Sequence, residues 1–180
     1  RTPPLPGEAG PMPDFIKSYV RFVDTFNRRV GLFAMYLIFA MFAILLYSSV
    51  SKAFHLPANW TLESAQFTMA AYYMLGGAFA MQTGDHVRMD LFYSQWSLRR
   101  RAAFDVVTAV ALITFLGFML FGGITSTTYA IQFKEKSFSA WAPYMAPIKM
   151  IMTFGIVMML AQATSSLFKD IAELRGRPIA

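Results

Sequence analysis

The sequence contains no cysteine, and only 14% of its 180 residues are charged. The missing cysteine excludes disulfide bridges, thiolate metal sites and thiol redox chemistry. The low charge content departs from that of soluble domains, in which roughly a quarter of the residues are charged. Apolar residues make up 56% of the chain. This composition is typical of an integral membrane protein.

Asp, Glu, Lys, Arg and His are absent from four long apolar stretches, residues 30–51, 64–82, 106–133 and 150–168. A transmembrane helix needs about 20 mostly apolar residues, and each stretch is close to that length. A buried helix of a soluble protein can be this apolar once, but four in a row indicate membrane spans. We therefore predict an all-α integral membrane protein with four transmembrane helices, at residues 30–51, 64–83, 106–132 and 148–168.

Lysine and arginine are distributed unevenly between the predicted loops. Residues 1–29, the loop after the second span and the tail at 169–180 hold twelve of the 16 cations, and the other two loops hold four. Loops rich in lysine and arginine stay in the cytoplasm. Both termini are therefore predicted to be cytoplasmic. No secretory signal is expected, because the first apolar run begins late and no small-residue cleavage site follows it.

The segment before the first span divides into two parts. Residues 1–13 contain five prolines and two glycines, which predicts a tail without helix. Residues 14–29, with Asp14 as a candidate N-cap, predict an amphipathic helix in the membrane interface. Its aromatic residues recur at helical spacing, at Phe15, Tyr19, Phe22 and Phe26, and its charged residues fall between them, at Lys17, Arg21, Asp24 and Arg28. Alternatively, these residues begin a long, tilted first span.

A second interfacial helix is predicted in the cytoplasmic loop at 86–104. Its anchor residues are spaced i, i+3, i+4 and i+7, at Met89, Phe92, Tyr93 and Trp96. The basic triplet that follows either contacts anionic lipid or serves only as a topology signal. The candidate lipid-interface residues of the chain are Arg28, Arg29, Trp96, Arg99, Arg100 and Arg101.

The second and third spans carry stripes of small residues. In the second span these are Gly76, Ala80 and Gly84, and in the third they are Gly122 with Ser126 and Gly123 with Thr127. Small residues on one face let helix backbones approach closely in lipid. The spacing leaves open whether the stripes pack against each other or against another protein.

The start of the second span combines a capping residue, Asn59 or Thr61, with Trp60 as an interfacial residue. Glu63 lies in the first turn, where the helix dipole favours an anion. Because ionisable groups inside a membrane usually mark a transport path, Glu63 is either a helix-end residue, which we favour, or a proton carrier.

Candidate chemistry is otherwise scarce. His55 and His86 fall in loops on opposite sides of the membrane, so they cannot ligate a buried haem together. A turn with local ion pairs accounts for His86 better than a metal site does. No glycine-rich phosphate loop is present. We predict no enzyme, no catalytic or metal site, no cofactor and no nucleic-acid partner. The polar residues of the spans are expected to form hydrogen bonds between helices; they are Gln66, Thr108, Thr125, Thr127, Thr128 and Gln162.

Three motifs carry a family resemblance. They are Asn59-Trp60-Thr61-Leu62-Glu63, then Gly76-Gly77-Ala78 followed by Gly84-Asp85-His86-Val87-Arg88-Met89-Asp90 and Tyr93, and finally the run from Ser137 to Pro147. Together with the four-span layout, they resemble the small, DctQ-like membrane subunit of tripartite ATP-independent periplasmic (TRAP) transporters. One departure is that Ile148, Lys149 and Met150 follow Pro147, where many members have a glycine.

The resemblance implies a function and a set of partners. The chain would be a non-catalytic scaffold subunit of a sodium-coupled secondary importer of organic acids in the bacterial inner membrane. It would brace the large permease subunit, which holds the solute and sodium sites, and a periplasmic receptor would deliver the solute. The alternative is a self-contained homo-oligomeric transporter or channel.

Candidate site residues follow from the motifs and the topology. Structural or partner-interface candidates are Trp60, Glu63, Gly76, Gly77, Ala80, Gly84, His86, Arg88, Asp90, Tyr93, Trp141, Pro143 and Pro147. The receptor-facing candidates, on the loop after the third span, are Lys134, Glu135 and Lys136.

Overall fold

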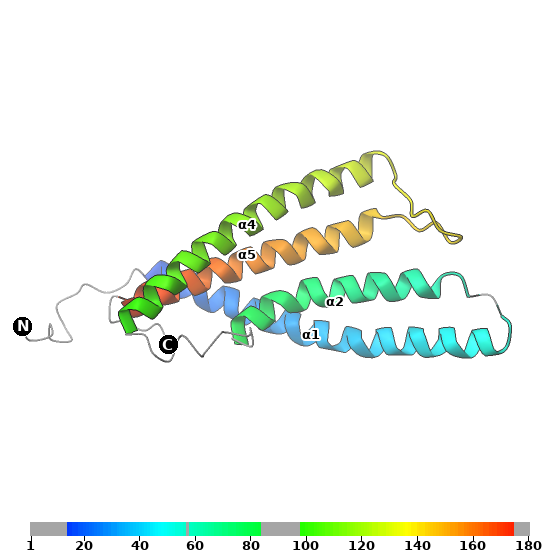
Figure 1. The fold of residues 1–180 in the computed structure, drawn as a ribbon, viewed down its shortest axis with the longest axis horizontal. Coiled ribbons are helices and arrows are strands. Elements are labelled where there is room, and N and C mark those ends of the chain that lie inside the picture. Colours follow the sequence, from blue (N-terminus) through cyan, green and yellow to red (C-terminus); the bar gives the residue numbers. More distant parts are fainter. Residues whose placement is uncertain (1–13, 57, 84–97, 175–180) are drawn as a thin grey trace, which may run out of the picture.

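The computed structural model describes residues 14–56, 58–83 and 98–174, and the side chains of 15–56, 58–83 and 106–172 (Figure 1). The described chain is helical, and its elements are α1 (Asp14–Ala53), α2 (Thr61–Thr83), α4 (Leu98–Gln132) and α5 (Ala146–Leu174). Three of these helices are long and apolar enough to cross a membrane, over Phe15–Ala53, Val106–Gln132 and Ala146–Ala172. The all-α membrane fold is therefore confirmed, with three of the four predicted spans meeting that criterion.

The predicted N-terminal interfacial helix does not form a separate element. Residues 14–29 and the first predicted span are one continuous helix of 40 residues, as in the alternative interpretation. The physical reason is that no proline interrupts the sequence between Asp14 and Ala53. The predicted interfacial helix at 86–104 lies mostly outside the described residues, and the part from Leu98 onward belongs to α4.

Two helices end in the same turn geometry. After α1, the amide of Leu56 donates to Ser51 O and the amide of His55 donates to Lys52 O, while His55 has a φ of 58°. After α4, the amide of Glu135 donates to Ala130 O and Lys134 has a φ of 48°. A left-handed residue with these bonds closes the last turn of a helix and reverses the chain. Both turns lie at the same end of the bundle (Figure 1).

The four helices form two antiparallel hairpins, α1–α2 and α4–α5 (Figure 1). α2 runs parallel to α5 and contacts both α1 and α5. A Cβ added at Gly155 would lie 2.8 Å from Met74 Cβ, and one added at Gly77 would lie 2.9 Å from Met159 Sδ. The close contact of α2 with α5 therefore depends on glycine, which has no side chain, at positions 77 and 155.

The main cluster of buried apolar residues is small and comes from α1, α2 and α5. Ala34, Leu75, Ala78 and Met158 form its centre. Large apolar side chains such as Phe118 and Phe121 are instead 75% exposed. Since lipid tails are as apolar as these side chains, the bundle gains little by burying them, and small residues pack between the helices.

Candidate functional site

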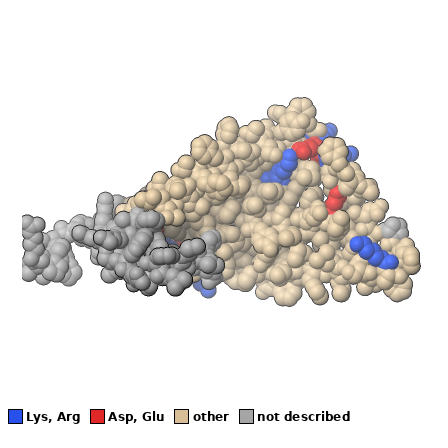
Figure 2. Space-filling model, viewed as in Figure 1, with Lys and Arg blue, Asp and Glu red and all other residues tan. Residues whose placement is uncertain are grey.

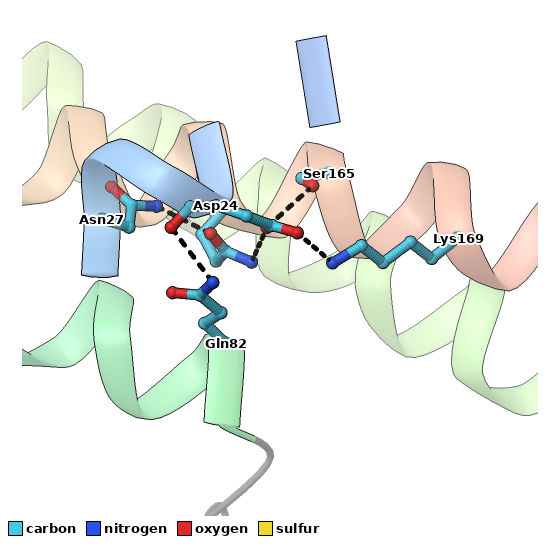
Figure 3. A network of polar contacts seen from close by, with 6 residues as sticks. Asp24, Asn27, Gln82, Ser165 and Lys169 are labelled. Carbon is cyan, nitrogen blue, oxygen red and sulfur yellow. Dashed lines mark hydrogen bonds and ion pairs between the residues drawn. The ribbon is translucent and has the colours of Figure 1, made fainter. Parts of the chain in front are cut away.

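A cluster of polar side chains joins α1, α2 and α5 at the end of the bundle where α1 begins and α5 ends (Figure 3). We call it the Asp24 cluster; its members are Asp24, Asn27, Gln82, Gln162, Ser165 and Lys169. Lys169 Nζ donates to Asp24 Oδ2 at 2.6 Å. Asn27 Nδ2 donates to Gln162 Oε1 at 2.7 Å. These contacts hold the first third of α1 against α5.

The carboxylate of Asp24 has two further hydrogen-bond donors. Gln162 Nε2 lies 3.2 Å from Asp24 Oδ1, and Ser165 Oγ lies 3.5 Å from it. Gln82 Nε2 donates to the backbone oxygen of Asp24 at 3.0 Å, which brings the end of α2 into the cluster. Asp24 thus faces α5 and α2, although the sequence pattern placed it with the charged residues of the interfacial face.

Burial makes this cluster energetically important. Asn27 and Gln162 are 1% and 0% exposed. A buried amide without a partner costs about 1–3 kcal/mol, so each of these two side chains depends on the other. Gln162 was predicted to bond between helices, and the structure confirms this. Asn27 was not singled out; the available signal was its place on the same helical face as Val20, Val23 and Ala34, which are all buried.

A second polar group, the Glu63 cluster, lies at the opposite end of the bundle and contains Ser48, Thr61, Glu63 and Ser137. Ser137 Oγ donates to Glu63 Oε1 at 2.8 Å, which links the first turn of α2 to the α4–α5 turn. Glu63 is 7% exposed, and its Oε2 atom has no hydrogen-bond partner among the described residues. Glu63 is therefore a buried helix-end residue that joins the two hairpins.

Thr61 has a different role from the predicted cap. Its hydroxyl donates to Ala58 O at 2.8 Å and lies 3.0 Å from Ser48 Oγ on α1. The first turn of α2 is closed instead by the backbone, where the amide of Ser64 donates to Trp60 O. The Trp60 ring, 41% exposed, lies 5.5 Å from the Tyr47 ring. Thr61 and Trp60 thus tie α2 to α1 at this end.

The three receptor-facing candidates lie in the α4–α5 turn and differ in their contacts. Glu135 forms an ion pair with Lys149 at the start of α5, so it stabilises the turn. Lys136 lies with its Nζ atom 5.0 Å from the centre of the Tyr144 ring. Lys134 is exposed. The turn also presents exposed aromatic residues, among them Phe138 and Trp141.

The small-residue stripes are divided between inner and outer faces. Gly123 packs toward Thr153, whose Oγ1 lies 2.9 Å from Thr127 Oγ1. A Cβ added at Gly76 or Gly122 would have no atom within 4 Å. Of each glycine pair, Gly77 and Gly123 therefore serve packing within the chain, whereas Gly76 and Gly122 lie on open faces.

The remaining candidates divide by position. Arg28 and Arg29 are exposed on α1, Gln66 is exposed on α2, and Pro147 lies in the first turn of α5, where its fixed φ suits a helix start. Thr125 and Thr128 bond to carbonyls of their own helix and do not join helices. The residues outside the described part of the chain are Gly84, His86, Arg88, Asp90, Tyr93 and Trp96, and the side chains of Arg99, Arg100 and Arg101 lie outside it too.

The chemistry of the two clusters is structural. Within residues 14–56, 58–83 and 98–174, no three His, Cys, Asp or Glu side chains are placed to hold a metal ion. The polar groups of the Asp24 cluster bond mainly to one another, and the apolar core lies between the two clusters. What the site does is fix the arrangement of the helices.

Comparison with known proteins places the chain in a family. The model of the family described as "Tripartite ATP-independent periplasmic transporters, DctQ component" matches residues 41–173. Comparison with curated proteins and with solved structures gave no significant match. The matched range covers residues 41–53 of α1, all of α2 and α4, and all but the last residue of α5. The chain belongs to the DctQ family of TRAP transporter components, which are non-enzymatic membrane subunits of a transport complex with a large permease and a periplasmic binding protein.

Proposed function

We propose that this chain is the stationary brace of a sodium-coupled importer of organic acids, in which the large permease subunit carries solute and sodium. The observation that carries the proposal is the placement of charge. The sequence has no Asp, Glu, Lys, Arg or His with which to move an ion or a carboxylate in four stretches, residues 30–51, 64–83, 106–133 and 150–168. The charged side chains visible in Figure 2 gather mainly toward the end with the two turns.

The proposal includes a fourth crossing by α2. α1 and α4 are both antiparallel to α5, so they run in the same direction. If both cross the membrane, the chain between them must return, and α2 is the described helix available for this. α2 does not meet the criterion of length and apolarity that the other three helices meet, which fits its position in contact with both α1 and α5. Both termini then lie on one side, which we place in the cytoplasm of a bacterial inner membrane.

Labelling of single introduced cysteines tests this topology, because the natural chain has none. Lys52→Cys, in the last turn of α1, and Lys134→Cys, after α4, are expected to react with a membrane-impermeant maleimide added to intact spheroplasts. Lys17→Cys is expected to react only after permeabilisation. Reaction of Lys52→Cys and Lys134→Cys from opposite sides would show that α2 does not cross.

Uptake measurements test the brace itself. Proteoliposomes containing the large subunit with this chain, supplied with the binding protein and a sodium gradient, are expected to take up solute. The large subunit alone is expected to lose at least about 90% of that rate, because an incompletely supported scaffold cannot hold the geometry that transport requires. Full uptake by the large subunit alone would contradict the proposal. Uptake by this chain alone would favour the homo-oligomeric transporter instead.

The α4–α5 turn is the part of the chain that we propose contacts the binding protein. Support comes from its exposed cations and aromatic side chains. Lys134→Glu combined with Lys136→Glu is expected to lower the apparent affinity for the loaded binding protein about tenfold at low salt, because charge at the rim of an interface steers association. Glu135 is left unchanged because its ion pair with Lys149 stabilises the turn.

Lys52→Glu is the control for that variant, since Lys52 is an exposed cation in the last turn of α1, at the same end of the bundle. It is expected to leave the apparent affinity unchanged. The control changes the net charge by half as much as the double variant. If only the net charge of this end matters, the control will therefore show about half the free-energy effect of the double variant. An unchanged double variant would exclude the turn as the contact.

A further inference from the structure

An apolar groove runs between the two hairpins. It is about 390 Å³ in volume and is lined by Val30, Phe33, Leu75, Met150, Ile151 and Phe154. These residues come from α1, α2 and α5, so the groove exists only where three helices meet. All six side chains are apolar. Apolar cavities stay free of ordered water, so in a membrane this groove will be filled by hydrocarbon.

A cation lies next to the α1 wall of the groove. Arg29 precedes Phe33 by four residues and follows Phe26 by three, so all three occupy one helical face. Phe26 contacts Phe154, with ring centroids 6.4 Å apart, which brings this face of α1 against the α5 wall. Arg29 is exposed, and no hydrogen bond or ion pair joins it to another described residue.

The direction of the groove suits an acyl chain that enters from Arg29. α1 and α5 are antiparallel, so Met150 lies about one turn farther than Phe154 from the Asp24 cluster. A chain that starts at Arg29 therefore passes Phe33 and Phe154 and ends near Met150, toward the middle of the bundle. A phosphate at Arg29 would gain a charge-assisted hydrogen bond with the guanidinium.

We propose that the groove between α1, α2 and α5 binds one acyl chain of an anionic phospholipid, whose phosphate is held by Arg29. The ligand class follows from two features, an apolar groove and, at the end where the headgroup would lie, a guanidinium without a partner among the described residues. A zwitterionic lipid fits the groove equally well, but Arg29 attracts it less strongly, since the lipid's own positive group offsets the phosphate charge. This inference is independent of the proposed role in transport.

Arg28 supplies a matched control. It is the neighbouring arginine, is also exposed, and is rotated by about 100° on the helix, away from the face of Phe26 and Phe33. Any effect of net charge or of general attraction to an anionic membrane is the same for both arginines. If a lipid binds in the groove as proposed, its retention depends on Arg29 and not on Arg28.

The test uses native mass spectrometry of the complex with its large subunit, released from detergent after incubation with phosphatidylglycerol or phosphatidylcholine. The wild type is expected to retain one phosphatidylglycerol in preference to phosphatidylcholine. Arg29→Gln is expected to lower retention of phosphatidylglycerol about fivefold, and Arg28→Gln is expected to leave it unchanged. Val30→Trp, which fills the groove, is expected to abolish retention, whereas Val50→Trp, on the exposed far end of α1, is not.

Two results would overturn the proposal. Equal retention by Arg29→Gln and Arg28→Gln would reduce the effect to general charge attraction. A photoreactive phenylalanine analogue at position 33 that crosslinks to the large subunit, and not to lipid, would show that the groove is covered by protein. Crosslinking to lipid together with the predicted variant pattern would establish the site even if uptake proved independent of this chain.

Discussion

Asn27→Leu and Gln162→Leu are each expected to lower the free energy of unfolding by about 1–3 kcal/mol, whereas the double variant is expected to cost much less than the sum. Asn27 Nδ2 donates to Gln162 Oε1 at 2.7 Å, and both side chains are almost fully buried. Each single substitution leaves one amide buried without its partner. The double substitution replaces both amides with apolar groups of similar size, so neither amide is left unpaired. The contact of Gln162 Nε2 with Asp24 Oδ1 is lost in Gln162→Leu and in the double variant alike, so it cancels in the comparison of the two.

The measurement is thermal or denaturant unfolding of the purified chain in detergent, analysed as a double-mutant cycle. Thr125→Val is the control, because the Thr125 hydroxyl bonds to its own helix on an exposed face of α4. It is expected to change stability by less than about 0.5 kcal/mol. Strictly additive costs for Asn27→Leu and Gln162→Leu would mean that the two amides do not depend on each other.

Gly155→Ala is expected to destabilise the chain by about 1–3 kcal/mol, the usual cost of overpacking a well-packed interface. The added methyl group would lie 2.8 Å from the Met74 carbonyl oxygen and 2.9 Å from its carbonyl carbon. These are backbone atoms of α2, so they cannot move aside as the end of a flexible side chain does. α2 and α5 would have to separate along their shared length.

Gly76→Ala and Gly122→Ala are the matched controls for this substitution, because an added Cβ meets nothing at either position. In a helix interior alanine is favoured over glycine by about 1 kcal/mol, so both variants are expected to be neutral or slightly more stable. Unfolding measurements in detergent would compare all three. A Gly155→Ala variant as stable as these controls would show that the close α2–α5 contact does not hold the bundle together.

The sequence predicted where the helices lie better than it predicted which of their faces are buried. The absence of charge between Asp105 and Lys134 limited the third predicted span to residues within 106–133, and the α4 helix ends inside this range, at Gln132. Charged residues are costly in hydrocarbon, so their positions limit where a span can lie. The same reasoning could not tell a separate N-terminal helix from a longer first span, since both satisfy the pattern before Arg29.

The buried face of α1 shows why side-chain pattern was less informative. Aromatic residues at helical spacing, among them Phe15 and Phe22, predicted a helix in the membrane interface, and the structure leaves both largely exposed. The pattern did not reveal the buried face of the same helix, which includes Val23 and Asn27. In water an aromatic stripe would pack inward. In a membrane the surrounding lipid is itself apolar, so small and polar side chains gain more from contact between helices.

The partners of Asp24 were beyond the reach of sequence reasoning for a related reason. Asp24 and Lys169 are separated by 145 positions, and nothing in local spacing connects them. The Glu63–Ser137 contact is likewise long-range, although the acidic residue at the start of α2 was recognised as a helix-end group. Packing of α1 against α5 had to be known before the first pairing could be identified, and packing of the two hairpins against each other before the second.

The length of α1 gives the Asp24 cluster a particular position relative to the bilayer. A helix of 40 residues is about 60 Å long, twice the roughly 30 Å thickness of the hydrocarbon layer. If the part between Arg29 and Lys52 fills that layer with a modest tilt, as predicted for the first span, Asp24 and Lys169 lie among the lipid headgroups. Mobile ions reach that zone and screen charges over about 8–10 Å. A change of ionic strength on that side of the membrane therefore acts directly on the joint between α1 and α5.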